Sequence, residues 1–278
     1  MKLTQTAICG WFGISRQAHH QMKLRHLVRA AREALILKEV QLIRTSHPRL
    51  GTRKLLVLLA DFFAKSGLHI GRDRLFDLLR SQDLLIQQKR KATRTTFPGG
   101  LRSENVLAST TITAPNQAFV VDITYIDTEP GFLYLALVTD LFSRKIVGWD
   151  LSNSLSLEGA LRALQMAVTH AGGQVADLIH HSDHGSQYTS RPYLDFMKEA
   201  GIRPSMGEVG NAYDNAVAER VNGILKLEYL LDQRFPDTRS AWQATEQAIH
   251  FYNSERPHSS LDLHTPEHVY AQALGQEA

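Results

Sequence analysis

The sequence predicts an α/β fold in which a mixed five-stranded sheet flanked by helices follows an all-helical region. First, the spacing of apolar residues is helical before about residue 87, and runs of β-branched and aromatic residues replace it after about residue 115. Second, the charge divides near the same place. Residues 1–100 hold 19 Lys and Arg against 6 Asp and Glu, a net charge of +13, and the remainder holds 12 against 22, a net charge of −10. A basic part joined to an acidic part indicates two domains.

Residues 1–87 have the sequence of a helical region of the helix–turn–helix type. Gly13 separates a first apolar stretch from a second helix for which Ser15 is a possible N-cap, and a long helix is expected from about residue 22 to residue 44. A second helix–turn–helix follows, and Gly67 is expected to end its first helix. The excess of positive charge favours binding to nucleic acid over a merely solvated surface. The candidate DNA-binding residues here are Arg53, Lys54, Arg72 and Arg74.

Residues 88–114 are predicted to form a basic linker, because "QQKRKATRTTFPGG" ends in a Pro-Gly-Gly run that is typical of loops. Its basic residues either follow a phosphate backbone or simply keep the linker solvated, and the sequence favours neither. These residues are Lys89, Arg90, Lys91 and Arg94.

After about residue 115 the pattern becomes that of an α/β core. Three consecutive antiparallel strands are predicted over residues 117–126, 132–140 and 145–152. An amphipathic helix, a short strand, a second helix, another short strand and two long helices follow. This order predicts an α/β core with a mixed sheet over residues 115–232 and a C-terminal helical extension over residues 233–278.

The composition excludes several classes of protein. Cys9 is the single cysteine, so an internal disulfide and a multi-cysteine metal site are excluded, which suits a reducing cytoplasm. The apolar run over residues 55–64 is broken by Asp61 and is too short to span a bilayer. The N-terminus lacks the apolar core of a secretory signal. We therefore expect a cytoplasmic protein with no membrane partner.

Three acidic residues lie at positions where an unpaired carboxylate would be unfavourable. Asp122 interrupts the apolar run of the first strand, Asp183 ends a short strand, and Glu219 follows Asp183 after a gap of 35 residues. Burying a carboxylate is costly unless it is paired or bound to metal, and grouped carboxylates repel unless a cation neutralises them. Hard divalent ions take such oxygen ligands, and two of them can clamp the oxygens of a phosphodiester displacement. Asp140 and Asp150 also lie at strand ends and are weaker alternatives to Asp122.

The predicted helix around Glu219 has a polar face. Asn215, Glu219, Asn222 and Lys226 follow a spacing of i, i+4, i+7 and i+11, which puts them on one side of the helix. The opposite side is apolar and is expected to pack against the core. For this helix alone, an ordinary solvated stripe is the simpler interpretation.

Three histidines surround Asp183 in "LIHHSDHGSQYTS". Imidazole favours softer ions than carboxylate oxygens do, and no cysteine lies near enough to complete a zinc site. We interpret His180 and His181 as residues of the strand end. His184 is either a neighbour that orients Asp183 or the DNA, or a simple turn residue.

Several stretches, in this order and spacing, resemble the DDE transposases of bacterial insertion sequences. They are "VVDITYI", "HSDHGSQYTS", "NAYDNAVAERVNGILKLE" and "YNSERPHSSLDLHTPEHVY", together with the 35-residue gap. The resemblance is to the group whose transposase is read from two overlapping frames, and the core is similar to that of retroviral integrases. It covers residues 115–275 with specific motifs and residues 45–90 with a less distinctive helix–turn–helix.

The resemblance implies a ribonuclease-H-like core in which Asp122, Asp183 and Glu219 are the catalytic residues and bind two Mg²⁺ ions, with Mn²⁺ as a substitute. It implies that water cleaves the element ends and that the freed 3′-hydroxyl attacks another phosphodiester, with no covalent protein–DNA intermediate. Lys226 matches a position expected to meet DNA near the cut. Weaker candidates for DNA contact are Tyr188, Asn215 and Arg220.

The resemblance also leaves alternatives. Retroviral integrases carry a His-His-Cys-Cys zinc module, which cannot form here because Cys9 stands alone beside His19 and His20.

We expect the chain to be a second-frame product that acts on double-stranded DNA as a homodimer or a larger synaptic complex. A structure-specific nuclease of the same superfold would cleave without joining strands. A DNA-binding repressor would bind without catalysis.

Overall fold

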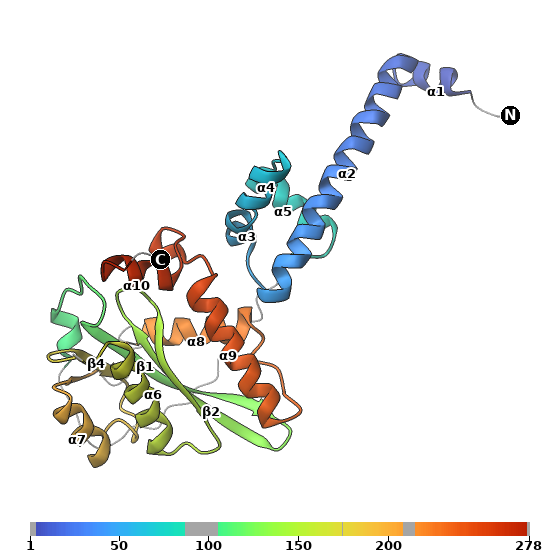
Figure 1. The fold of residues 1–278 in the computed structure, drawn as a ribbon. Helices are drawn as coiled ribbons and strands as arrows, with labels where there is room; N and C mark the ends of the chain where they lie inside the picture. Colours follow the sequence, from blue (N-terminus) through green and yellow to red (C-terminus); the bar gives the residue numbers. More distant parts are fainter. Residues whose placement is uncertain (1–3, 87–104, 174, 208–214, 277–278) are drawn as a thin grey trace. The chain divides into compact units, whose positions relative to one another are not determined.

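The computed structural model describes residues 4–86, 105–173, 175–207 and 215–276 of the 278-residue chain. The described residues form two compact units (Figure 1). The helical unit contains residues 4–46 and 50–86, and the sheet unit contains residues 47–49 and the described residues from 105 onward. The predicted domain boundaries at residues 87, 114 and 232 stay a prediction. The basic linker residues lie outside the described residues: Lys89, Arg90, Lys91 and Arg94.

The helical unit consists of five helices in its described part. They are α1 (Gln5–Trp11), α2 (Arg16–Ser46), α3 (Thr52–Leu58), α4 (Ala60–Ser66) and α5 (Arg72–Ser81). The Ser15 hydroxyl accepts a hydrogen bond from the backbone N–H of Ala18 at 3.0 Å, so the predicted N-cap is confirmed. Helix α2 is longer than the predicted span at both ends. Gly67 ends α4 in the left-handed conformation, with φ of 65°, as predicted.

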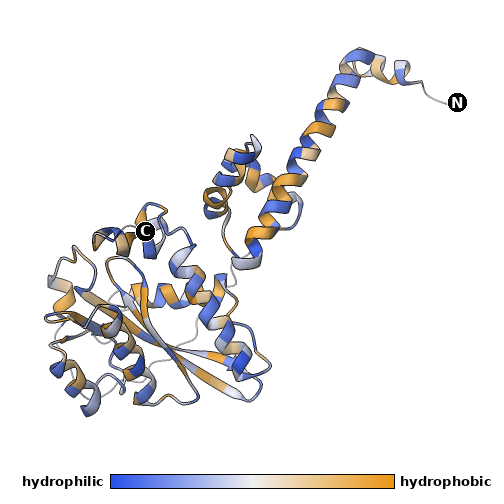
Figure 2. Ribbon diagram, viewed as in Figure 1, coloured by the Kyte–Doolittle hydropathy of each residue, from blue (hydrophilic) through white to orange (hydrophobic). Residues whose placement is uncertain are grey.

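One predicted helix of this unit is two helices in the structure. Leu59 interrupts the helical pattern between α3 and α4 with ψ near −8°, and its side chain is fully buried. The core of the unit joins α2 to α3 and α5 through residues such as Val40, Leu55 and Leu75. Orange bands recur along α2 in Figure 2, and Leu24 and Leu27 are exposed apolar residues in its N-terminal half.

The sheet unit contains a mixed sheet of five strands in the order β3-β2-β1-β4-β5. The strands are β1 (Ala118–Thr128), β2 (Gly131–Asp140), β3 (Ile146–Ser152), β4 (Ile179–Ser182) and β5 (Arg203–Met206). Strands β1, β2 and β3 are antiparallel because short turns connect them, whereas β4 is parallel to both β1 and β5. The predicted mixed five-stranded sheet is therefore confirmed.

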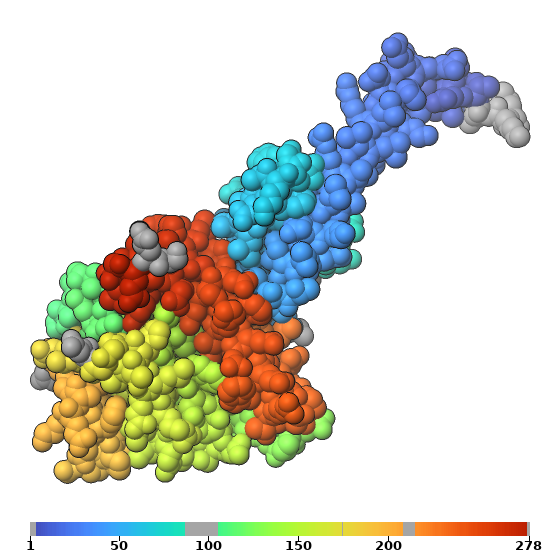
Figure 3. Space-filling model, in the orientation of Figure 1, coloured from blue at the N-terminus to red at the C-terminus, as the bar shows by residue number. Residues whose placement is uncertain are grey.

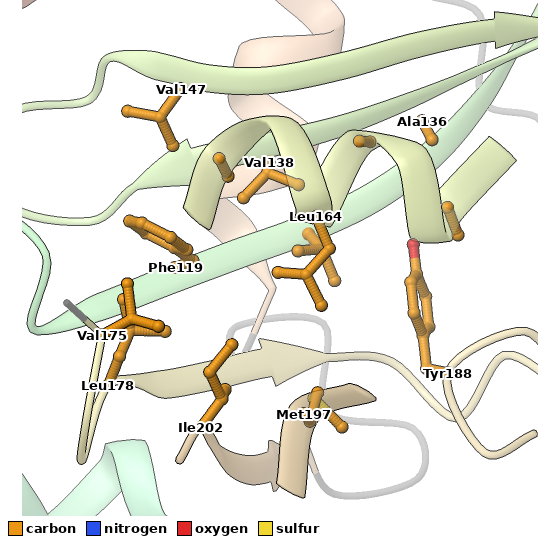
Figure 4. Packing of buried hydrophobic residues seen from close by; sticks show 14 of the residues in the cluster. Phe119, Ala136, Val138, Val147, Leu164, Val175, Leu178, Tyr188, Met197 and Ile202 are labelled. Carbon is orange, nitrogen blue, oxygen red and sulfur yellow. The ribbon is translucent and has the colours of Figure 1, made fainter. Parts of the chain in front are cut away.

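Helices cover both faces of this sheet. They are α6 (Leu157–His170), α7 (Arg191–Glu199), α8 (Ala216–Glu228), α9 (Thr238–Ser254) and α10 (Pro266–Ala273), with short 3₁₀ turns at Val106–Ser109 and Ser259–Leu261. One face packs Phe119 and Val138 against α6 and α7 (Figure 4). The other face packs Ile126 and Leu135 against α8 and α9. In the space-filling view the red surface of α9 and α10 adjoins the yellow-green surface of the sheet unit (Figure 3).

No helix in the described part of the chain is long and apolar enough to cross a membrane.

Gly148 fixes the close approach of α6 to β3. A Cβ atom at this position would lie 2.1 Å from the backbone oxygen of Ala163 and 2.8 Å from the backbone nitrogen of Ala167. Both atoms belong to the helix backbone, so α6 would have to move away from the sheet.

Gly148→Ala is therefore expected to lower the free energy of unfolding by about 1–3 kcal/mol or more, as overpacking does. Thermal and urea unfolding would measure it. Gly223→Ala on α8 is the matched control, since nothing lies within 4 Å of its added Cβ. That control should be neutral or stabilising by up to about 1 kcal/mol, because alanine favours a helix. Equal loss of stability in both variants would contradict this account.

Candidate active site

The parallel pairing of β1 with β4 brings two acidic residues to the same level. Ala118 pairs with Ile179 and Val120 pairs with His181. Continuing this register by two residues places Asp122, in the middle of β1, opposite Asp183, which directly follows the carboxyl end of β4. Because side chains alternate along a strand, the two carboxylates point to the same face, and adjacent strands lie about 4.8 Å apart.

Asp122 is held by two hydrogen bonds. Its Oδ1 accepts from the backbone N–H of Ile123 at 2.9 Å, and its Oδ2 accepts from Nδ2 of Asn222 at 2.6 Å. The pKa of Asp122 is raised to about 7, chiefly by burial and then by the negative charge of Asp183, while the two hydrogen bonds partly oppose the rise. Asp183 accepts a hydrogen bond from the backbone N–H of Gly185 at 3.0 Å. The two carboxylates therefore repel each other when both are ionised, and a bound cation would remove this repulsion.

The predicted polar face of α8 lies against β1. Asn215 donates to the backbone oxygen of Val121 at 3.4 Å, Asn222 binds Asp122, and Lys226 Nζ lies 4.0 Å from the ring centre of Tyr125. On the other side of the helix, the predicted apolar residues pack into the core; they include Val221, Ile224 and Leu225.

Glu219 lies in the first turn of α8 and is exposed. Its charge raises the pKa of Asp122 only as the smallest of the contributions. Among the described residues, no three His, Cys, Asp or Glu side chains lie close enough to hold one metal ion. The structure therefore brings Asp122 and Asp183 together and leaves Glu219 outside their immediate cluster.

The residues present fit a hard divalent cation. Two carboxylates lie side by side on the same face, and Mg²⁺ typically takes one or two carboxylates with water and phosphate oxygens completing its shell. Two amide oxygens beside them, Oδ1 of Asn215 and Oδ1 of Asn222, are buried and have no hydrogen-bond partner. Each could accept a hydrogen bond from a metal-bound water, which would remove the cost of leaving a buried acceptor unpaired.

The competing strand-end acids have structural partners. The Asp140 carboxylate accepts from the backbone N–H and hydroxyl of Ser143 at 2.7 and 2.6 Å, and from the backbone N–H of Asn116 at 2.8 Å. The Asp150 carboxylate forms an ion pair with Arg162 at 2.8 Å. Their oxygens hold turns and helices in place, which leaves Asp122 as the better candidate.

The three histidines are buried parts of the framework. His180 Nε2 hydrogen bonds to the Tyr193 hydroxyl at 2.8 Å, and His181 Nδ1 to the Ser205 hydroxyl at 3.0 Å. The Nε2 of His184 donates to the backbone oxygen of Gly207 at 2.7 Å. His184 thereby ties the segment after β4 to the segment after β5.

The candidate DNA-binding residues fall into two groups. In the helical unit, Arg53 is exposed on α3 and Lys54 is half-buried. On α5, Arg72 forms an ion pair with Asp73, and Arg74 forms one with Glu33 at 2.6 Å. In the sheet unit, Arg220 is exposed on α8.

Tyr188 does not lie on the surface. Only 3% of it is exposed, and its ring packs against His180 and Tyr193 in the core. Figure 4 shows it extending from the segment after β4 toward α6. This placement argues against the predicted DNA contact, because a large aromatic ring gains more from burial in this core than from exposure.

Two residues of the site escaped the sequence-based selection. Asn222 lies on the predicted polar face, but nothing in its type shows that it binds Asp122. Tyr125 reads as an ordinary strand residue in "VVDITYI". Spacing was a signal only for Asn222, which follows Glu219 by three residues on a helix. On a strand the same spacing puts side chains on opposite faces, so it gave no signal for Tyr125.

The chain is similar to known protein families and to proteins of insertion elements. Residues 112–212 match an integrase core domain family, and residues 200–266 match a second family with the same description. The chain is 37% identical over 267 residues to an uncharacterized 31 kDa protein of insertion element IS600 from Shigella sonnei, which covers 93% of this chain and 96% of that protein. It is 31% identical over 274 residues to the transposase for insertion sequence element IS629 from the same organism, covering 96% and 90%.

Solved structures with similar folds include a simian T-cell lymphotropic virus intasome in complex with PP2A regulatory subunit B56 gamma. The match has a TM-score of 0.48 and 18% identity, and covers 80% of this chain and 70% of that chain. The HTLV-2 integrase catalytic core domain in complex with magnesium matches with a TM-score of 0.45 and 19% identity, covering 56% and 97%. The family matches and the observed sheet order confirm the predicted ribonuclease-H-like core.

His180 is expected to make the fold sensitive to acid. Burial lowers the pKa of His180 to about 4, below its ordinary value of 6.5. The stability that comes from its neutral form is fully present above pH 6.5 and is lost as the pH falls toward 4, by up to about 3 kcal/mol. Urea unfolding between these pH values should show a smaller loss for His180→Gln than for the wild type. The exposed His250→Gln should behave like the wild type, and equal pH dependence in all three proteins would refute the assignment.

Proposed function

We propose a metal-dependent mechanism of cleavage and joining for this chain, which belongs to the insertion-sequence transposases that carry an integrase core domain. The resemblance predicted from the sequence is thus confirmed, and the chain is a polynucleotidyl transferase of the DDE type that acts on DNA. The individual steps and the roles of single residues are our proposal.

Asp122 and Asp183 are the proposed metal ligands, and Glu219 is the proposed third. The observation that carries this assignment is the register of β1 with β4, which places Asp122 in the middle of β1 beside Asp183 just after β4, close enough for the charge of Asp183 to raise the pKa of Asp122. Glu219 lies one turn before Asn222, which binds Asp122, so it lies on the side of α8 that carries the contact with the pair. Carboxylate oxygens favour Mg²⁺, with Mn²⁺ as a substitute, and two ions are the expected number.

When bound, the ions would supply Lewis-acid activation of the attacking oxygen and neutralise charge on the phosphate. In the first step a water oxygen bonds to phosphorus at the element end. The bond from phosphorus to the 3′-oxygen breaks, and the leaving oxygen ends as a 3′-hydroxyl. In the second step this hydroxyl bonds to a phosphorus of target DNA and displaces another 3′-oxygen. One phosphodiester is exchanged for another, so no external energy source is needed.

The chain's own residues are proposed to bind and orient the DNA. Lys226 contacts the strand near the cut, and Asn215, which precedes α8, and Arg220 in the first half of α8 make further contacts with DNA. The basic helical unit binds the duplex through contacts with its phosphates. These contacts favour binding because they release counterions from the DNA. Because two element ends are joined to one target, we propose a homodimer or a larger synaptic complex, acting on double-stranded DNA in the cytoplasm.

Asp183→Asn and Glu219→Gln test the ligand assignment. Each is expected to lower Mg²⁺-dependent cleavage of an element-end duplex by more than about 100-fold, because loss of even an outer partner of a metal ligand costs about 10- to 100-fold. Thermal unfolding and DNA affinity should stay near those of the wild type. Glu199→Gln, an exposed acid on α7, is the control and should keep full activity. Full activity in Glu219→Gln would remove Glu219 from the site.

A joining assay separates transposition from the alternatives. We expect that a pre-cleaved end with a free 3′-hydroxyl will become covalently joined to a supercoiled plasmid when Mg²⁺ is present. Gel electrophoresis of the labelled end measures this product. Cleavage without any joined product would indicate a structure-specific nuclease. Binding without cleavage at any metal concentration would indicate a repressor.

A further inference from the structure

Lys226 lies beside the carboxylates without being paired to one. Its Nζ is 4.0 Å from the ring centre of Tyr125, and no ion pair joins it to an acid in the described ranges. It follows Asn222 by one turn of α8, so it extends along β1 in line with the hydrogen bond from Asn222 to Asp122. Burial lowers the pKa of Lys226, and the charge of Asp122 opposes that decrease.

The contact with an aromatic ring has a different consequence from an ion pair. A carboxylate partner would neutralise the ammonium and occupy its hydrogens, whereas a ring attracts the cation through its quadrupole alone. The three N–H donors of Lys226 can therefore still reach an anion. A flexible lysine stem loses much side-chain entropy when it is fixed, so a partner that fixes it beforehand favours later binding.

Tyr125 is itself held in place. It lies in β1 opposite Tyr134 of β2, within the longest ladder of the sheet. The Phe132 ring meets the Tyr125 ring edge-on, with centroids 5.3 Å apart and an angle of 70° between the planes. Phe132 is 54% exposed, so the pair stands at the surface beside Lys226.

We propose that Tyr125 is a positioning residue that holds the Lys226 ammonium beside the carboxylate pair, ready to bind a phosphate of the DNA strand being cut. This inference rests on the proposed function, because it assumes that the scissile strand passes Asp122 and Asp183. It adds a residue that touches neither metal nor reacting atoms and acts through Lys226.

The test is a double-mutant cycle on DNA binding without divalent ions. The probe is a duplex from the end of the encoding insertion sequence, and its affinity is measured across a range of NaCl concentrations. Lys226→Gln should lower the slope of log affinity against log salt by about 1, as loss of one phosphate contact does. Tyr125→Leu should give the same decrease, and Tyr125→Phe, which keeps the ring, should keep the wild-type slope. The double variant Tyr125→Leu with Lys226→Gln should bind no more weakly than Lys226→Gln alone.

Tyr134→Leu is the matched control, because it removes a ring from the same strand pair without touching a cation. It should keep the wild-type slope, while thermal unfolding confirms that every variant folds. A wild-type slope in Tyr125→Leu, or additive losses in the double variant, would overturn the positioning role.

The two proposals fail in different ways. A wild-type protein that binds DNA but neither cleaves nor joins it would refute the proposed function, and the salt slopes would still be readable. A wild-type protein that cleaves and joins, with no coupling between Tyr125 and Lys226, would refute only the inference about Tyr125.

Discussion

The parallel pairing of β1 with β4 is the contact on which the candidate site depends. It is short, with three pairs from Ala118 to Val120, yet it sets the level at which Asp122 and Asp183 meet. A slip of one residue would turn every side chain of β4 to the opposite face. Packing disfavours this slip, because all four residues of β4 are buried and each would have to exchange its place for one on the opposite face. The hydrophobic effect on a few strand residues thus fixes the spacing of two charges.

Helix α8 is the second support of the site, and distant parts of the chain hold it at both ends. At its start Asn215 bonds to the edge of β1. At its end Glu228 receives two hydrogen bonds from the guanidinium of Arg256, at 2.8 and 2.9 Å, and Arg256 is 1% exposed. Breaking a buried bidentate pair leaves a charge unpaired in the interior, which is far more costly than losing a surface pair. The segment after α9 therefore fixes the helix that carries Glu219 and Lys226.

Much of this fold could be predicted from local sequence signals. The strands were predicted to within two residues at each end, and Gly67 and Ser15 mark helix boundaries as expected, because turns and caps depend on single residues. Asp122 was identified because a carboxylate inside an apolar run is costly. Tyr188 could not be placed in the same way, since its burial depends on how the segment after β4 folds back onto the core.

The pairing of β4 with β1 also could not be predicted from local sequence signals. Fifty or more residues separate the two strands in the chain, and a parallel register depends on packing across the whole sheet. The role of Asn222 follows from that same packing, because only the docking of α8 brings its amide to Asp122. The spacing of the residues predicted the polar face of α8, but it did not predict that this face packs against β1.

The partial pairing of β1 has a consequence for solubility. Beyond Val120, no named strand in the described part of the chain pairs with the side of β1 opposite β2. Peptide groups left unpaired on such an edge are a site where a foreign strand can add. Other segments of the chain form hydrogen bonds with this side of β1. The side-chain amide of Asn215 donates to the backbone oxygen of Val121. The backbone N–H of Phe235 donates to the backbone oxygen of Asp127, and the backbone oxygen of Phe235 accepts from the N–H of Glu129. The elements that build the site thereby also protect the sheet from aggregation by strand addition.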